Sequence, residues 1–290
     1  MNATISVKLI TMLFTLKSPE RVCKLIELFK VIKSLNNFCT MYCKSTGIFI
    51  QTMDDAHVSL MDINIEKDWF EHFDSEEETI SVNIKVLSTV LSLYTPNTEM
   101  TFISSDDYLE ISLKYDDLTE KSFELPRIDI DCDVMNSQVI DHSLEFSINT
   151  KKMDRYICDM QLFGDTMELV YVNEVIYMRS NGDDGKYCLK LTTDLVDDLI
   201  VEEDLKLMAR VPLRFPAAVT KMFSVFEQIY IQISENAPFT FKMGDIVEND
   251  ESEELMKIIY YVAPKIEDDD EFDFSEFEQE DDDCKNEIVG

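Results

Sequence analysis

Glycine and histidine are both scarce in this chain, with 6 and 3 copies among 290 residues. The sequence contains no G-x-x-x-x-G-K-[ST] phosphate loop, no H-E-x-x-H zinc motif and no G-x-S-x-G nucleophile turn. Acidic pairs such as Asp54-Asp55 imitate a catalytic dyad, but solvated turns explain such pairs better among 59 acidic residues. We therefore expect no enzyme, no catalytic residue and no cofactor, and a carboxylate-based hydrolase is the weakest alternative.

The seven cysteines include no C-x-x-C pair, which argues against a zinc ribbon or a dithiol redox site. We predict free, buried thiols in a reducing compartment and no metal site. No apolar run approaches the ~18 residues that cross a bilayer. The apolar residues 1–17 are interrupted by Lys8 and lack a basic first region and a small-residue cleavage site. These features favour a protein inside the cell that has no membrane partner.

Basic residues are outnumbered, with 26 Lys and Arg against 59 Asp and Glu and a net charge of −33. This balance excludes a simple basic nucleic-acid binder. Residues 267–290 hold 13 of the acidic residues and one lysine, and this composition predicts an acidic disordered tail. Phe272, Phe274 and Phe277 interrupt the acidic run, and both a partner-docking motif and a merely solubilising tail fit them.

The remaining sequence alternates short strand patterns with four helical segments, which predicts an α+β fold. Apolar positions alternate in 47–53, 57–65, 167–172 and 175–180, as is typical of half-buried strands. The segments 19–36, 84–93, 150–163 and 211–223 show helical spacing instead. Pro216 falls inside the last segment, so we expect that helix to be short or kinked.

An internal repeat supports two copies of one α+β unit. Residues 38–63 align with 166–191 without a gap, at an offset of 128. Ile48 then matches Ile176, and Leu60 matches Cys188, with the same inward-facing parity.

Charge is sorted between the helical segments and the rest of the chain. The four segments hold ten basic and four acidic residues, a sum of +6, while all other residues sum to −39. Ordinary solvated helix faces are one explanation. The other is a single positive surface built from helices, where an otherwise anion-repelling body holds a polyanion. The ten basic residues are Arg21, Lys24, Lys30, Lys33, Lys85, Lys151, Lys152, Arg155, Arg214 and Lys221.

Two motifs resemble the proliferating cell nuclear antigen (PCNA) family of DNA sliding clamps. The first is GIFIQTMDDAHVSL at residues 47–60, and the second is YYVAPKIED at residues 260–268. Between them, Arg155 with 163–165 resembles the helix of the family's second domain. Residues 213–215 with 220–221 resemble its last helix, and 237–238 the strand entry that follows. The likeness spans roughly residues 14–270, in the family's order.

The resemblance implies a fold of two clamp domains, at 1–126 and 144–266, joined by a linker at 127–143 and followed by the acidic tail at 267–290. It also implies a closed homotrimeric ring that encircles double-stranded DNA without reading its sequence, with the ten basic residues facing the DNA. The implied partners are DNA polymerase, other clamp-binding proteins and a clamp loader. The implied location is the nucleus, or a cytoplasmic viral replication compartment if the source is a virus.

The resemblance further implies a front-face pocket where partner proteins dock a short peptide beneath the linker. Each buried anchor of such a peptide is typically worth ~2 kcal/mol. Ordinary core packing is the alternative for Val58 and Leu60. The matching positions are Met53, His57, Val58, Leu60, Met135, Pro238, Tyr261, Ala263 and Pro264.

Several positions depart from the family pattern and indicate a divergent member. Met135 and Ser137 stand where the family has leucine and isoleucine, so peptide preference is expected to differ. Segment 84–93 keeps only Lys85, and Asn173 replaces the lysine that receives modifications. Two alternatives remain open: a checkpoint-type clamp subunit, and an acidic clamp-fold scaffold without processivity activity.

Overall fold

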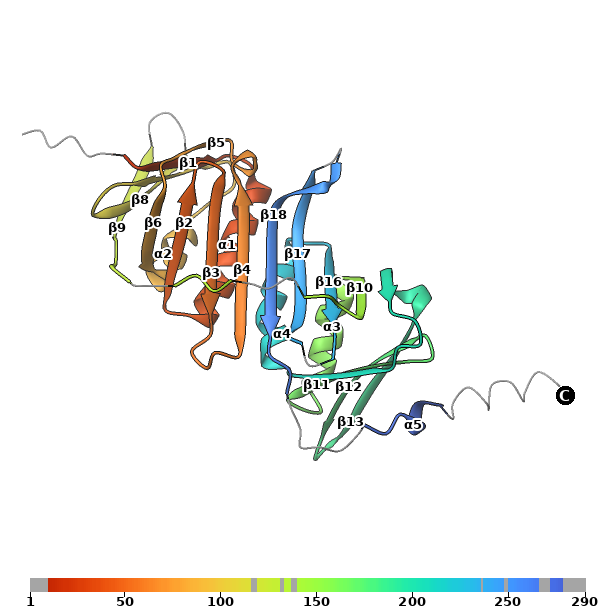
Figure 1. The fold of residues 1–290 in the computed structure, drawn as a ribbon. Coiled ribbons are helices and arrows are strands. Elements are labelled where there is room, and N and C mark those ends of the chain that lie inside the picture. Colours follow the sequence, from red (N-terminus) through yellow and green to blue (C-terminus); the bar gives the residue numbers. More distant parts are fainter. Residues whose placement is uncertain are drawn as a thin grey trace, which may run out of the picture. The chain divides into compact units, whose positions relative to one another are not determined.

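A computed structural model describes residues 10–115, 119–130, 133–136, 140–235, 237–247, 250–265 and 272–278. The chain forms two compact units (Figure 1). The first unit comprises Met1–Ser137, Ser224–Phe226 and Met243–Tyr260. The second comprises Gln138–Phe223, Glu227–Lys242 and Tyr261–Gly290, so the end of the chain contributes to both. The domain limits expected from the sequence stay a prediction.

The first unit packs two antiparallel sheets against two helices. One sheet has the order β5-β1-β7-β8-β9, and the other contains β18-β4-β3-β2-β6. The elements, in chain order, are β1 (Met12–Leu16), α1 (Pro19–Leu35), β2 (Phe38–Lys44), β3 (Gly47–Met53), β4 (Ser59–Glu66), a 3₁₀ turn (Lys67–Trp69), β5 (His72–Ser75), β6 (Glu78–Asn83), α2 (Ile84–Leu91), β7 (Glu99–Ser104), β8 (Tyr108–Lys114) and β9 (Glu120–Pro126).

The second unit repeats this plan with one sheet ordered β13-β12-β11-β15 and another containing β14-β10-β16-β17. Its elements are β10 (Leu144–Asn149), α3 (Thr150–Met160), β11 (Thr166–Val172), β12 (Val175–Gly182), β13 (Gly185–Thr192), a 3₁₀ turn (Thr193–Leu195), β14 (Asp197–Val201), β15 (Leu207–Pro212), α4 (Arg214–Val219), a 3₁₀ helix (Thr220–Ser224), β16 (Gln228–Ile233), β17 (Phe239–Val247), β18 (Asp250–Val262) and α5 (Ser275–Glu278). Strands β17 and β18 carry residues of both units.

The internal repeat is confirmed by the strands that it covers. The offset of 128 places β2 on β11, β3 on β12 and β4 on β13. Strands β2, β3 and β4 form consecutive antiparallel hairpins, and so do β11, β12 and β13. The predicted α+β class is also confirmed.

Local signals explain where the helices begin. Ser18 caps α1 by accepting a hydrogen bond from the Arg21 amide at 3.4 Å, and Pro19 occupies the first turn. Asn83 and Asn149 cap α2 and α3 in the same way. Buried residues at three-to-four spacing line α1, as the amphipathic pattern predicts.

The fourth predicted helix, 211–223, is shorter than its pattern suggested. Strand β15 continues to Pro212, so α4 begins at Arg214 and Pro216 lies in its first turn. An amide there has no partner within the helix, and the proline therefore removes no hydrogen bond. A 3₁₀ helix, Thr220–Ser224, replaces the predicted continuation.

Two sequence predictions need correction. The first is the prediction that the free cysteine thiols are buried, which holds for only two of the described cysteines. The thiols of Cys39 and Cys43 are buried, and burial raises the pKa of both to about 12. Cys23, Cys158 and Cys188 are free but exposed.

Among the described residues, every helix is too short or too polar to span a membrane.

The second correction concerns the predicted disordered tail. Within it, residues 272–278 are ordered and contain α5, because the Phe277 side chain is buried among apolar residues of the second unit. The remainder of the predicted tail, 267–271 and 279–290, lies outside the described residues.

Asp245 of β17 ties three parts of the first unit together. Its carboxylate accepts hydrogen bonds from the Lys24 ammonium at 2.6 Å and from the Trp69 indole at 2.9 Å. Trp69 is fully buried, and the Lys24 side chain is only 10% exposed. Burial alone would lower the pKa of Lys24, but hydrogen bonds to Asp245 and Glu20 outweigh it and raise that pKa. The buried cation thus depends on this carboxylate.

Replacing this carboxylate should strongly destabilise the first unit. Asp245→Ala leaves Lys24 with only the exposed Glu20 and leaves the Trp69 indole without its acceptor. We expect a loss of about 3–5 kcal/mol in the free energy of unfolding, measured by denaturant titration of the full chain. Asp74→Ala, at an exposed strand position, is the matched control. Equal denaturation midpoints for the two variants would contradict the proposed anchor.

Candidate functional site

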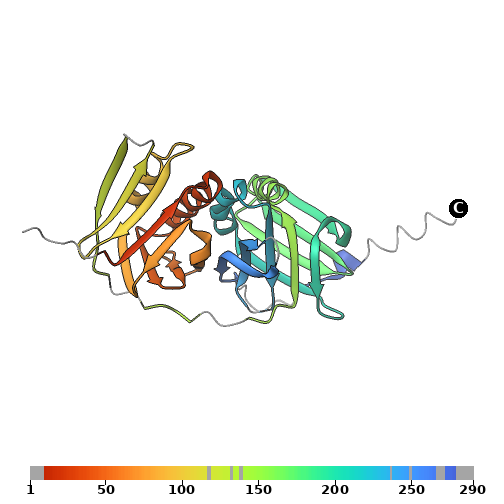
Figure 2. The ribbon, with the colours of Figure 1, turned by 90° about the horizontal axis from the view of Figure 1, so that it is seen from above.

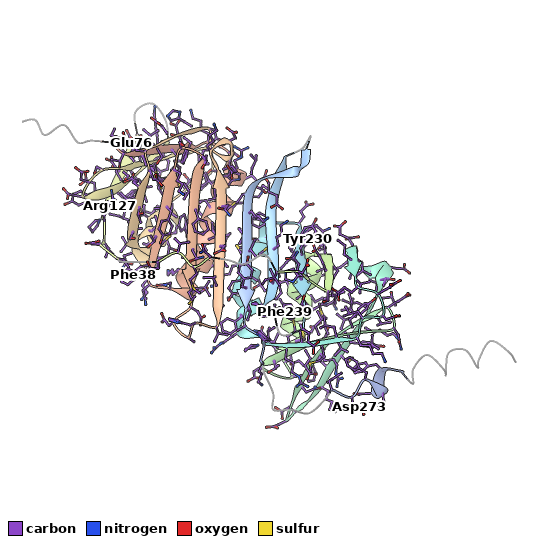
Figure 3. All side chains as sticks on the ribbon, viewed as in Figure 1. Phe38, Glu76, Arg127, Tyr230, Phe239 and Asp273 are labelled. Carbon is purple, nitrogen blue, oxygen red and sulfur yellow. The ribbon has the colours of Figure 1, made fainter. Side chains whose placement is uncertain are left out.

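The linker begins at Arg127, which is labelled in Figure 3. The Arg127 side chain is the centre of a hydrogen-bond network. Its guanidinium donates to Glu78 at 3.0 Å, to the Ser105 carbonyl at 2.9 Å and to the Thr79 carbonyl at 2.6 Å. The amide of Ile128 also donates to the carbonyl of Ser81 on β6 at 2.8 Å. The start of the linker is therefore fixed to the edge strand β6.

Farther along, the linker is held by the side chain of Gln51 on β3. The Gln51 amide group donates to the Met135 carbonyl at 2.9 Å, and its oxygen accepts the Met135 amide at 2.8 Å. The second Gln51 N–H donates to Asp62 at 2.9 Å, so both ends of the amide are satisfied. The Gln51 side chain thus binds both the N–H and the C=O of Met135, as the backbone of a neighbouring β-strand would.

The face that receives the linker also carries predicted pocket residues. Gln51 and Met53 are two residues apart on β3, so their side chains lie on the same side of the sheet. Leu60 is the register partner of Met53, as Asp62 is of Gln51. Met53 and Leu60 are half-buried, and Met135 is 52% exposed. The structure thus places Met53 and Leu60 side by side as a partly open apolar surface next to Gln51, which binds the backbone of Met135.

The turn between β3 and β4 is organised by Asp54. Its carboxylate accepts hydrogen bonds from the amides of Ser59 at 2.6 Å, Val58 at 2.9 Å and Ala56 at 3.2 Å. Burial opposes ionisation, but these hydrogen bonds outweigh it and lower the pKa of Asp54. The carboxylate therefore stabilises the turn above the ordinary carboxyl pKa and loses this effect only as pH falls through the lowered value.

His57 and Val58 lie in this turn. His57 is exposed and takes a left-handed backbone conformation with φ 57°, while Val58 is half-buried. Both predicted pocket residues are thus set by the Asp54 turn next to the apolar surface.

The remaining predicted pocket residues belong to the second unit. Pro238 directly precedes β17, and Tyr261 lies at the end of β18. These two strands are neighbours, so Pro238 and Tyr261 mark the same end of one hairpin. Tyr261 and Pro264 are half-buried, and Ala263 is exposed.

Sequence reasoning missed Gln51, Asp62 and the role of Arg127. Asp62 is a polar residue on a strand, yet it is only 4% exposed. A buried carboxylate on the outward-facing side of an alternating strand is a signal that something covers that side.

The ten basic helix residues differ in how available their charge is. In the first unit, Arg21 donates to the Trp69 carbonyl at 2.6 Å and Lys30 pairs with Glu27 at 2.6 Å. Lys24 is buried against Asp245, so its assignment to a DNA-facing surface is wrong for this reason. Seven members of the set are exposed. Two belong to the first unit, Lys33 and Lys85, and five belong to the second unit: Lys151, Lys152, Arg155, Arg214 and Lys221.

The exposed cations of the second unit extend from one end of α3 to the 3₁₀ helix after α4. Lys151 and Lys152 are in the first turn of α3, and Arg155 follows with 81% of its side chain exposed. The side chain of Arg155 is 4.0 Å from that of Asp159, and an exposed ion pair at this distance contributes little to stability.

Among the described residues no cluster of metal-binding side chains occurs.

Comparison with known proteins finds the same family along most of the chain. Residues 20–134 match the model of the proliferating cell nuclear antigen N-terminal domain. A "Probable DNA polymerase sliding clamp 2" of Paramecium bursaria Chlorella virus 1 is 25% identical over 247 residues, covering 84% of this chain and 88% of the relative. "Proliferating cell nuclear antigen 2" of Plasmodium falciparum is 22% identical over 262 residues, covering 83% and 94%.

A solved structure shares the fold. The crystal structure of proliferating cellular nuclear antigen from Entamoeba histolytica matches with a TM-score of 0.76 at 18% identity. The match covers 89% of this chain and all of that chain. The resemblance drawn from the two sequence motifs is confirmed, and so is a fold of two clamp domains.

Proposed function

From this kinship with the PCNA sliding clamps, we propose that the chain is a DNA sliding clamp and not an enzyme. Three copies close into a ring around duplex DNA, with the helices toward the DNA. The ring tethers DNA polymerase and other replication and repair proteins to their template, and a clamp loader places it there. The observation that carries this proposal is the sorting of charge, +6 on the helical segments and −39 elsewhere.

The physical argument rests on how DNA attracts protein cations. Exposed Lys and Arg side chains on the helices contact phosphates without reading bases, so the ring can slide. A strongly acidic remainder repels DNA from every other surface. A ring that encloses its ligand needs only weak affinity, and seven exposed helix cations are compatible with that.

Two sheet edges support assembly into a ring. Strand β9 ends one sheet of the first unit, and β13 ends one sheet of the second. Edge strands readily add a strand from another chain, and pairing between two different edges makes a head-to-tail contact that closes into a ring. The strands also differ in charge, since β9 carries Glu120, Lys121 and Glu124 for a net charge of −1, whereas β13 carries Lys186 and Lys190 for +2.

Peptide docking is the second part of the proposal. The linker is held at Gln51, beside Met53 and Leu60 on the same face of the sheet, and leaves Met135 partly exposed, as a cover for an apolar anchor requires. Tyr261 and Pro264 would complete the pocket, in accordance with the family resemblance. The working location is the nucleus or a viral replication compartment.

One observation favours the acidic scaffold as a second candidate. Of the five basic residues on the first unit's helices, Lys33 and Lys85 are exposed, whereas Lys24 is buried and neutralised by Asp245. A scaffold of this kind would not raise the processivity of a polymerase, so the same assay separates the two functions.

Reversing charge on the second unit's helices should strongly reduce processivity. We expect the triple variant Lys152→Glu, Arg155→Glu and Lys221→Glu to lose at least about tenfold in processivity on primed circular DNA with a loader present. Each lost phosphate contact should also reduce the salt dependence of binding by about 0.9 in log–log slope.

The matched control reverses Lys17, Lys44 and Lys67, three exposed lysines outside the four predicted helical segments, and changes the net charge equally. It should retain processivity. If the helix variant retains processivity and the same native mass, the positive DNA-facing surface is refuted.

Removing the Tyr261 ring should weaken docking of partner peptides. We expect Tyr261→Ala to raise the Kd of a fluorescent clamp-binding peptide by about tenfold, or about 1.4 kcal/mol, through loss of an apolar contact. Tyr108→Ala, on β8 of the first unit, removes the same ring from an exposed position away from the predicted pocket residues and should leave the Kd unchanged. Equal affinities for both variants would remove Tyr261 from the pocket.

A further inference from the structure

Strand β11 of the second unit is buried on both faces. From Met167 to Val172 every residue is buried, although alternate side chains point to opposite sides of a sheet. The register places Val170 opposite Tyr177 and Met208, and Val172 opposite Val175. These residues share one face, and the tail segment Phe272–Glu278 covers it.

The tail segment contacts this face through three phenylalanines. Phe277 is 6% exposed, and its ring centroid lies 4.7 Å from that of Tyr177. Phe272 and Phe274 are partly buried against the same cluster, with ring centroids 4.9 Å apart. The three side chains bury an apolar patch that would otherwise face solvent.

Charged groups border the patch and match the acidic tail. Arg179 and Arg210 lie on either side of Glu168, at 3.7 and 2.6 Å, so two cations share one anion. Arg179 contacts Glu276 at 3.4 Å, and its guanidinium lies 5.1 Å from the centre of the Phe277 ring. Arg210 lies 5.9 Å from the Phe272 ring. The border thus favours an anionic segment that carries aromatic rings.

The tail segment is held locally rather than by a folded domain. Helix α5 has four residues, too few to be stable alone in water, and Asp273 caps it by accepting the Ser275 amide at 2.9 Å (Figure 3). The chain leaves β18 through Lys265, whose amide donates to the Arg210 carbonyl at 2.7 Å. The six residues 266–271 then join it to the segment. A tether this short gives an effective concentration of order mM, so weak contacts suffice.

The internal repeat identifies the same position in the first unit as a holder of an added segment. Arg179 corresponds to Gln51 at the offset of 128, and Tyr177 corresponds to Phe49. Gln51 holds the linker by two hydrogen bonds, whereas Arg179 holds the tail. The outer face of the repeat therefore binds an additional segment in both units.

We propose that the outer face of the sheet β13-β12-β11-β15 is a second peptide-docking site. It takes protein segments that carry spaced phenylalanines among carboxylates, and residues 272–278 are its resident occupant. A partner segment of this chemistry binds by displacing the tail. The site is separate from the pocket under the linker, and it does not depend on DNA binding.

The test compares the full chain with a full-chain variant whose tail anchors are removed, Phe272→Ser, Phe274→Ser and Phe277→Ser. The probe is a fluorescent peptide of residues 266–290, followed by fluorescence anisotropy. We expect the variant to bind it at least about tenfold more tightly than the unmodified chain, because the resident tail no longer competes. Adding Arg179→Glu to the variant should abolish binding, whereas adding Arg155→Glu should not.

Equal affinity of both chains for the peptide would overturn the proposal, as would no binding to a variant with an unchanged near-ultraviolet spectrum. If the variant does not fold, hydrogen exchange on the unmodified chain decides. Excess peptide should then speed exchange of the Phe277 amide, which donates to the Phe274 carbonyl at 3.0 Å. Unchanged exchange at saturating peptide would equally overturn it.

Discussion

Electrostatic repulsion between duplex DNA and a chain of net charge −33 is the constraint that the proposed function has to meet. The chain meets it by placing its exposed helix cations on α1, α2, α3 and the residues around α4. Most of the carboxylates lie outside the four helical segments. A basic protein would bind DNA at many surfaces, whereas this distribution leaves one kind of surface where a polyanion is tolerated.

The distribution is uneven between the units. Lys24 has become part of the first unit's interior, where Asp245 neutralises it and also binds the Trp69 indole. The second unit keeps five exposed helix cations and its helices contribute most of the available charge. Within the proposed ring, α3 and the residues after α4 therefore provide most of the phosphate contacts.

In both units, the outer face of a sheet binds an additional segment of the chain. Each unit carries a strand whose outward polar side chain binds a segment that is not part of the sheet: Gln51 binds the linker and Arg179 binds the tail. Figure 2 shows the first unit with α1 on one side of its sheets and the start of the linker on the other. In the proposed clamp, helix faces would contact nucleic acid and the outer faces of the sheets would bind peptides.

Sequence patterns predicted most of the fold but only part of the site. Alternation located β3, β4, β11 and β12, and helical spacing located α1 to α4, because burial of one face requires those periods. The end of β15 at Pro212 was missed, since a strand followed by a proline-containing turn of helix has the same apolar content as one longer helix. The burial of Lys24 was missed because its partner Asp245 is 221 residues away.

The contacts of the tail segment with the second unit were missed for the same reason, because they join residues far apart in the sequence. Its composition predicts a segment that cannot fold alone, but the Phe277 side chain packs on a surface made by Val170, Val172, Val175 and Tyr177. Composition describes what a segment can bury by itself, and not what another part of the chain offers it.

The native mass of the full chain at moderate salt and micromolar concentration tests the central claim most directly. An encircling clamp built from this chain predicts a single species of three copies, about three times the chain mass of 33.7 kDa. A species of one chain only, under conditions where the protein supports DNA synthesis, would contradict a ring as the source of its action.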